Sequence, residues 1–229
     1  MNSIVETIKS LPLLEGVSEE RMKHVVATLP LHFLKYPEGD VIFSEGSPCT
    51  HLNYVISGSV RVTITNSTGR FKVSQTLTGP DLIAPEYLFG RRTTFPCSVV
   101  AREVTGILQI SKTDYISMLR TDDVMLFNYL NLLAAGAQSK IDGILSLTDG
   151  LLEERIAYWI VALTQRTGSD IVLSCRQRDL YSFFGVQRSV FNSTLQSLAQ
   201  RGIITYSSTE IRPTSRDALV RLLLNSDHE

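Results

Sequence analysis

The chain has 229 residues, 22 Lys and Arg against 23 Asp and Glu, and 43% hydrophobic residues. This composition is that of a globular protein and excludes disordered, collagen-like and disulfide-rich chains. The longest apolar stretch, 157–163, is far shorter than the roughly 20 residues that cross a bilayer, and the N-terminus lacks a basic start followed by an apolar core. We therefore predict a cytoplasmic protein with no secretion signal and no membrane partner.

The first 111 residues change from a helical to a strand-like pattern. Ser18 followed by two glutamates predicts a capped helix, because Met22 and Val25 then recur at helical spacing. From about residue 31, segments rich in β-branched and aromatic residues are separated by Gly, Pro, Asn or Ser turns: 41–43, 54–56, 60–64 and 104–110. Many short strands at this spacing predict a β-sandwich or a barrel-like roll.

Two helices are expected after the β region. Ser111 to Asp114 resembles a capping box and predicts a short helix to about Leu119. A longer helix follows, with apolar residues that alternate spacings of three and four: Phe127, Leu130, Ala134, Ala137, Ile141 and Ile144. We call these six residues the α-helical seam. Such a seam packs along a partner helix, which could be the same helix of a second copy; the alternative is that the seam covers the β domain.

The C-terminal third is basic and helical. A helix is predicted from about Leu151 to Gln165, and residues 175–221 then carry seven arginines against three acidic residues. Within this stretch the pattern predicts a helix, a tight turn at Gly185 and a second helix that starts near Gln187, followed by a small hairpin over 203–213. This order is typical of a winged helix-turn-helix, and the alternative is an ordinary helical hairpin with a solvated polar face.

The second of these helices carries residue types that read DNA. Arg can pair with guanine, Gln and Asn can pair with adenine, and Ser hydroxyls reach phosphate or either type of base. At the start of the first helix, Arg and backbone N–H groups are expected to grip phosphates and set the register. The predicted DNA-binding residues are Gln177, Arg178, Gln187, Arg188, Ser189, Asn192 and Ser193.

The order of these parts resembles the cyclic AMP receptor protein/FNR family of bacterial transcription regulators. Segments 36–46 and 52–62 look like the family's opening strands and central hairpin, and the helix-turn-helix positions also match. The resemblance implies an α+β fold: a double-stranded β-roll of the cyclic-nucleotide-binding-like or jelly-roll type over 1–120, a long dimerisation helix over 121–147, and a winged helix-turn-helix over 148–229.

The same resemblance implies a function and partners. We expect a homodimer that binds double-stranded DNA at a two-fold symmetric operator, with RNA polymerase as a candidate partner, and this favours the dimer interpretation of the seam. Ser189 and Ser193 replace the Glu and the second Arg that are usual in the cyclic-AMP branch, so we expect a different operator sequence. Position 176 lacks the usual capping hydroxyl, so Ser174 is expected to cap the first helix unless that helix starts elsewhere.

The residues that would hold cyclic AMP are replaced. Members that bind it carry Gly-Glu, whose Glu takes the ribose hydroxyl, and Arg-Ser or Arg-Thr, whose Arg neutralises the phosphate. Here Ala84-Pro85 and Phe95-Pro96 stand at those positions, and both prolines lack an N–H donor. We therefore predict that the chain does not bind cyclic AMP and that its effector is unknown. The candidate residues for an effector pocket are Glu86, Tyr87, Arg91, Arg92 and Phe95. The cleft could instead be filled by its own aromatic side chains or hold a more apolar ligand.

The sequence also offers little support for the residues that other sensor types of the family, or a metal-dependent enzyme, would need. Residues 1–30 contain no cysteine for an iron–sulfur cluster, and His32 and His51 are weak candidates for a haem ligand. A redox switch at Cys49 or Cys97 would need a lowered thiol pKa. The four scattered histidines do not form a metal site of the cupin-enzyme type, so we predict no cofactor, no metal and no enzymatic activity. A regulator without any small-molecule effector, controlled by abundance or a protein partner, is the main alternative.

Overall fold

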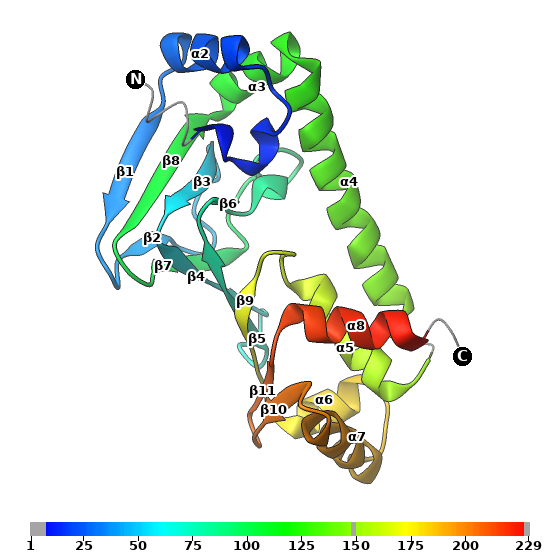
Figure 1. Cartoon of the computed structure of the whole chain (residues 1–229). Coiled ribbons are helices and arrows are strands. Elements are labelled where there is room, and N and C mark those ends of the chain that lie inside the picture. Colours follow the sequence, from blue (N-terminus) through cyan, green and yellow to red (C-terminus); the bar gives the residue numbers. More distant parts are fainter. Residues whose placement is uncertain (1–7, 148–149, 227–229) are drawn as a thin grey trace. The chain divides into compact units, whose positions relative to one another are not determined.

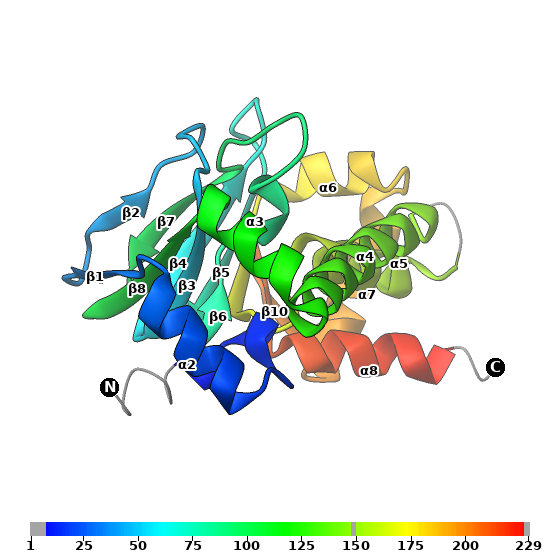
Figure 2. The ribbon, with the colours of Figure 1, turned by 90° about the horizontal axis from the view of Figure 1, so that it is seen from above.

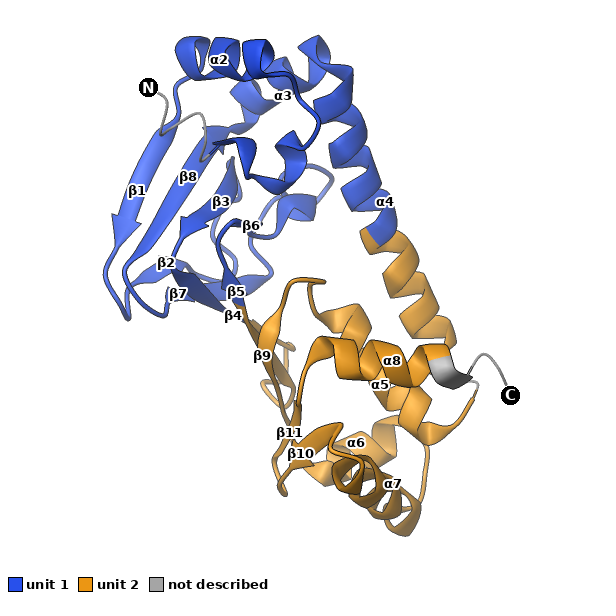
Figure 3. Ribbon diagram, viewed as in Figure 1, with its two compact units in different colours: residues 1–62, 77–135 blue, residues 63–76, 136–229 orange. Residues whose placement is uncertain are grey.

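The computed structural model describes residues 8–147 and 150–226 (Figure 1). The chain forms two compact units: unit 1 contains residues 1–62 and 77–135, and unit 2 contains residues 63–76 and 136–229 (Figure 3). Their boundary divides the long helix and assigns the tip of one hairpin to unit 2. The three-part functional division proposed from the sequence stays a prediction. None of the helices in the described part of the chain is long and apolar enough to cross a membrane.

Unit 1 is a β-roll made of two antiparallel sheets. The first sheet pairs, in order, β1 (His32–Tyr36), β8 (Thr105–Ser111), β3 (His51–Ser57) and β6 (Asp81–Leu82). The second contains β2 (Val41–Phe43), β7 (Cys97–Ala101) and β4 (Ser59–Thr65), to which β5 (Lys72–Thr78) is joined. Along β4, Val60 and Val62 are buried while their neighbours are partly exposed, so one face of this predicted strand meets the core.

Short helices close one end of this roll. A 3₁₀ turn, η1 (Pro12–Leu14), precedes α2 (Glu19–Thr28), and α3 (Lys112–Thr121) lies beside α2 at the same end of unit 1 (Figures 1 and 2). Both helices begin as the sequence predicts, because the backbone N–H of residue 21 donates to Ser18 Oγ over 3.3 Å and that of residue 114 donates to Ser111 Oγ over 3.1 Å. Helix α3 ends two residues later than expected.

The long helix α4 (Asp123–Leu145) packs into unit 1 through residues other than the seam. Met125 and Tyr129 are buried, at 1% and 4% exposure, whereas Phe127 is 61% and Ile141 56% exposed. The rest of the seam is exposed too: Leu130, Ala134, Ala137 and Ile144. In the single chain the seam therefore does not cover the β domain, and a continuous apolar stripe is left facing solvent.

Unit 2 packs helices against a small sheet. Its helices are α5 (Leu152–Leu163), α6 (Gln177–Phe183), α7 (Arg188–Gln200) and α8 (Arg216–Ser226). Its strands pair in the order β5, β9 (Ser169–Ser174), β11 (Glu210–Pro213) and β10 (Ile204–Tyr206). The helix-turn-helix and the hairpin were predicted, but β9 and α8 were not. The core of unit 2 joins Ile156 and Ile160 of α5 to the apolar face of α7 and to Leu219 of α8.

Candidate nucleic-acid interface

The turn between α6 and α7 sets the direction of the second helix. Gly185 has a φ of +67°, in the left-handed region that a residue with a side chain rarely adopts. This conformation lets the N–H of Val186 donate to the carbonyl of Tyr181 over 3.0 Å, which ends α6, and α7 begins three residues after the glycine. Phe191, with Leu195 and Leu198, then anchors α7 in the core, because all three side chains are at most 1% exposed.

The opposite face of α7 presents four of the predicted DNA-reading residues together. Gln187, Arg188 and Ser189 are exposed in the first turn, and Ser193 is exposed one turn later, although its hydroxyl donates to the carbonyl of residue 190 over 2.9 Å. Asn192 differs from them because it is half-buried, and its Oδ1 is enclosed without a hydrogen-bond partner among the described residues. The first turn of α7 is thus the part that is free to meet a ligand.

The start of α6 differs from the sequence prediction. The expected cap by Ser174 is wrong, because the chain stays extended through that residue as the end of β9, and the N-cap is Arg176 without a side-chain hydrogen bond. The turn of the hairpin supplies acceptors here instead. The backbone N–H of Gln177 donates to the carbonyl of Ser208 over 3.3 Å, and its Nε2 donates to the carbonyl of Ser207 over 3.0 Å. Gln177 therefore holds the hairpin, a role that residue type alone does not indicate.

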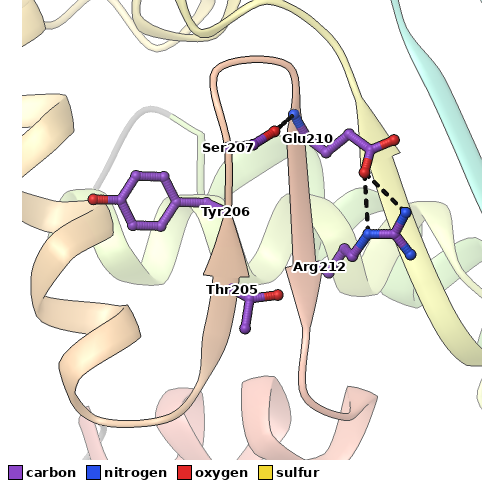
Figure 4. Close-up of a pocket in the computed structure, with 5 residues that line it drawn as sticks. All are labelled: Thr205, Tyr206, Ser207, Glu210 and Arg212. Carbon is purple, nitrogen blue, oxygen red and sulfur yellow. Dashed lines mark hydrogen bonds and ion pairs between the residues drawn. The ribbon is translucent and has the colours of Figure 1, made fainter.

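The hairpin β10–β11 forms the wing and bounds a small hollow of about 160 Å³. Arg212 Nη2 lies 2.8 Å from Glu210 Oε2, and Ser207 Oγ accepts a hydrogen bond from the N–H of Glu210 over 3.1 Å. Figure 4 shows Tyr206 pointing away from one side of the hairpin and this ion pair lying on the other. Because Glu210 neutralises Arg212, the wing adds less positive charge than its composition suggests.

Three arginines around α6 and the start of α7 are free to meet an anion. Arg176, Arg178 and Arg188 are exposed and form no ion pair with another described residue. Arg216, by contrast, is half-buried, and burial lowers the pKa of its guanidinium. Of the local basic charge predicted from the sequence, these three exposed arginines lie on the helix-turn-helix, whereas Arg212 is paired and Arg216 is half-buried.

Two known domains match this chain in the order that the structure shows. Residues 33–122 match the cyclic nucleotide-binding domain, and residues 154–222 match the Crp-like helix-turn-helix domain. The chain is also 28% identical over 205 residues to the cyclic AMP receptor protein of Thermus thermophilus, which covers 86% of this chain and 89% of that protein. The chain belongs to the cyclic AMP receptor protein/FNR family. It is a transcription regulator of this type, with a helix-turn-helix DNA-binding domain.

Solved structures of the family share the fold. The catabolite activator protein of Thermus thermophilus aligns with a TM-score of 0.51 and 22% identity, over 93% of this chain and 99% of that chain. The sensor domain of the regulator DNR from Pseudomonas aeruginosa aligns with a TM-score of 0.53 and 18% identity, over 62% of this chain and 93% of that chain. The predicted α+β fold, with a β-rich N-terminal domain, a long helix and a C-terminal helix-turn-helix, is confirmed.

The stretch 82–98, which resembles the family's phosphate-binding segment, contains the predicted pocket candidates. Its acidic and basic candidates, Glu86, Arg91 and Arg92, are exposed, and Tyr87 is half-buried in the 3₁₀ turn η2 (Pro85–Tyr87). Phe95 is only 2% exposed and stacks on a ring of β2, Phe43, with the centroids 4.2 Å apart. The structure therefore separates the aromatic candidate, which is packed in the roll, from the three charged candidates, which face solvent.

A residue of α4 that sequence reasoning missed reaches this segment within unit 1. The hydroxyl of Tyr129 donates to the carbonyl of Pro85 over 3.0 Å, and its ring lies 5.8 Å from the ring of Phe89. Tyr115 of α3 packs edge-on against the same tyrosine ring, at 5.3 Å. The available signal was a tyrosine four residues after Met125, on the same face of the helix, because a buried phenol usually needs a hydrogen-bond partner.

The thiols of unit 1 do not fit a redox switch, and its two candidate haem ligands lie near each other. Burial raises the pKa of the Cys49 thiol to about 11 and that of Cys97 to about 12, and the negative charge of Glu86 adds to both shifts. A redox switch needs the opposite shift. His32 is exposed and its ring lies 6.4 Å from that of His51. Over residues 8–147 and 150–226, no three His, Cys, Asp or Glu side chains gather in a group that could hold a metal ion.

Proposed function

We propose that the chain acts as a homodimer that places two copies of α7 in successive major grooves of a two-fold symmetric DNA site. The exposed first turn of α7, with Arg188 at its start and Phe191 anchoring the helix from below, is the observation that carries this proposal. In such dimers the two reading helices lie roughly 34 Å apart, one turn of DNA. Arg188 is then expected to read guanine, and Arg178 to grip a phosphate.

The exposed seam of α4 supports the second copy. An apolar stripe along a helix is unfavourable in water, and a symmetry-related helix offers a matching stripe. Ala134 and Ala137 near its middle would let two backbones approach closely. A dimer also doubles the number of cations that meet DNA phosphates, which matters here because Glu210 neutralises one arginine of each copy.

The experiment that tests the reading helix is a selection of bound fragments from a random DNA pool, followed by binding titrations with the recovered duplex. Arg188→Ala should weaken specific binding by about 1 to 3 kcal/mol and leave the fold intact. We expect a palindromic motif that differs from the half-site of the cyclic-AMP branch, because Ser189 and Ser193 replace its usual Glu and Arg. Unchanged binding by Arg188→Ala would show that α7 is not the reader.

We infer that the effector, where one is bound, is not cyclic AMP, although the name of the Thermus relative refers to that nucleotide. The argument is chemical: a cyclic phosphate needs a cation and N–H donors, whereas Phe95 and two prolines occupy those positions here. Native mass spectrometry and a thermal-shift series with cyclic nucleotides, haem and fatty acids test this. A large upward shift of the melting temperature with cyclic AMP would contradict the inference.

A regulator without a small-molecule effector is the second candidate function. The packing of Phe95 on Phe43 favours it, because a buried, stacked ring offers a ligand neither a charge nor a hydrogen bond at this position. This alternative predicts that the purified chain binds its operator at full affinity, carries no co-purified compound and responds to none of the compounds tested. Control would then come from abundance or from a protein partner, for which RNA polymerase is the first candidate to test.

A further inference from the structure

Helix α5 contacts the helix-turn-helix at two places, the end of α6 and the end of α7. The contacts come from Arg155 and Glu153, two residues apart in α5. At one end, Arg155 Nη2 donates to the carbonyl of Phe184 over 2.7 Å, and its guanidinium carbon lies 5.7 Å from the centroid of the Phe184 ring. At the other end, Arg201 Nη1 donates to both oxygens of Glu153, over 3.0 and 2.8 Å. Phe184 is the C-cap of α6 and Arg201 is the C-cap of α7, so the two contacts bracket the turn and the whole of α7.

Each contact places charge where a helix end favours it. The carbonyls at the end of α6 lack partners within the helix and carry partial negative charge, which the Arg155 guanidinium neutralises. Arg155 is half-buried, and its Nε is enclosed without a partner among the described residues. The surrounding atoms therefore restrict the position of this side chain. Glu153 lies in the first turn of α5, where a carboxylate is favourable, before it reaches Arg201.

Apolar packing alone would leave the angle of α7 less well defined. The contacts of Phe191 and Leu195 with the core hold the helix down, but burial of apolar surface has no direction. Helix α7 has 13 residues and is therefore about 20 Å long. A rotation of about 5° around one end moves the other end by nearly 2 Å, whereas a hydrogen bond to a base tolerates only about half an ångström.

We propose that Arg155 and Glu153 are positioning residues for DNA recognition, which fix the angle of α7 without touching the DNA themselves. This inference rests on the proposed use of α7 as the reading helix. Loss of either contact should weaken binding to the specific site, because base contacts need the helix in register. Binding to unrelated DNA should change little, because attraction to phosphates does not depend on that register.

The test compares full-length Arg155→Met and Glu153→Gln with the wild-type chain, on the selected operator and on a scrambled duplex. Fluorescence anisotropy at several salt concentrations should show a loss of about tenfold or more on the operator, while affinity for scrambled DNA and the salt slope stay within about twofold. Glu19→Gln is the matched control, because Glu19 forms an exposed ion pair with Lys23 in α2 at 2.9 Å, far from α7 in the sequence. Circular dichroism and a melting curve establish that each variant is folded.

A charge exchange separates positioning from direct DNA contact and does not depend on the stability of Arg155→Met. Glu153→Arg and Arg201→Glu should each weaken specific binding, and the double variant should restore most of it, since the ion pair re-forms in the opposite sense. If specific binding recovers with an acidic residue at position 201, the loss in the single variants is due to the broken contact between positions 153 and 201. It is not due to a lost contact with a phosphate, which an acidic side chain would repel. The inference is overturned if the double variant is no better than the single ones while Arg188→Ala still weakens binding. An Arg188→Ala variant that binds normally would instead overturn the proposed function.

Discussion

The seam of α4 gives the most direct test of the quaternary structure. Ile141 is 56% exposed in the single chain. Full burial of such a side chain stabilises a protein by about 1.5 to 3 kcal/mol, so covering the exposed half contributes on the order of 1 to 1.5 kcal/mol in each copy. A two-fold interface buries it twice. Ile141→Glu should therefore raise the dimer dissociation constant by at least about thirtyfold, and two like charges facing each other increase the effect further.

Sedimentation velocity over about a hundredfold range of protein concentration measures this change. Ala135→Glu is the matched control: it adds the same charge to an exposed site of α4, about 100° around the helix from Ala134 of the seam. We expect a dimer for the wild-type chain and for Ala135→Glu, and a monomer for Ile141→Glu with an unchanged melting temperature. Equal sedimentation of all three proteins would refute the seam as the dimer interface, and a large loss of stability without dissociation would indicate that it covers another part of the same chain.

Three further changes test unit 2 and the buried thiols. Phe191→Ala removes a ring that is 0% exposed in the core of unit 2 and should lower the free energy of unfolding by about 3 to 5 kcal/mol, measured by denaturant titration; a loss below about 1 kcal/mol would contradict the packing described. Glu210→Gln releases Arg212 and should tighten binding to non-specific DNA and steepen its salt dependence by about one phosphate contact, so an unchanged salt slope would mean that the wing lies away from DNA. Because the folded pKa of Cys97 is raised to about 12, the unfolded chain loses this proton first, and the free energy of unfolding should fall as the pH rises above about 8.5; the Cys97→Ala variant should show a shallower fall.

The elements with a local signal were the ones that the sequence predicted. Ser18 and Ser111 cap their helices as expected, and the apolar spacing of α7 matches the face that it buries. Strand β9 was missed because it has only three consecutive buried apolar residues, 171–173, and pairs with β5, almost a hundred residues earlier in the chain. Helix α8 did carry a signal, since the backbone N–H of residue 218 donates to Ser215 Oγ over 3.0 Å and leucines follow at helical spacing.

In the candidate interface, the sequence shows which residues have the chemistry to bind DNA, but it does not show which of their side chains are already engaged by the protein. Gln177 and Arg212 have the chemistry for phosphates, but the wing carbonyl and Glu210 engage them. Arg155 shows the converse, because nothing in its sequence context points to DNA, yet it meets the turn before α7. Such pairings join residues 29 or more positions apart in two of these three cases, and local sequence patterns carry no information about them.

The segment 84–96 combines a left-handed backbone turn with aromatic packing. Ala84, which the resemblance matches to a glycine of members that bind cyclic AMP, has a left-handed φ of 46°, although this costs a residue with a side chain on the order of 1 kcal/mol. The hydrogen bond from Tyr129 to the carbonyl of Pro85 and the burial of that proline hold the segment in place. The Arg position meanwhile holds Phe95, which packs on Phe43 of β2. The segment therefore combines a left-handed backbone turn with an aromatic contact in place of the expected charge, and this combination supports the proposal of a signal other than cyclic AMP.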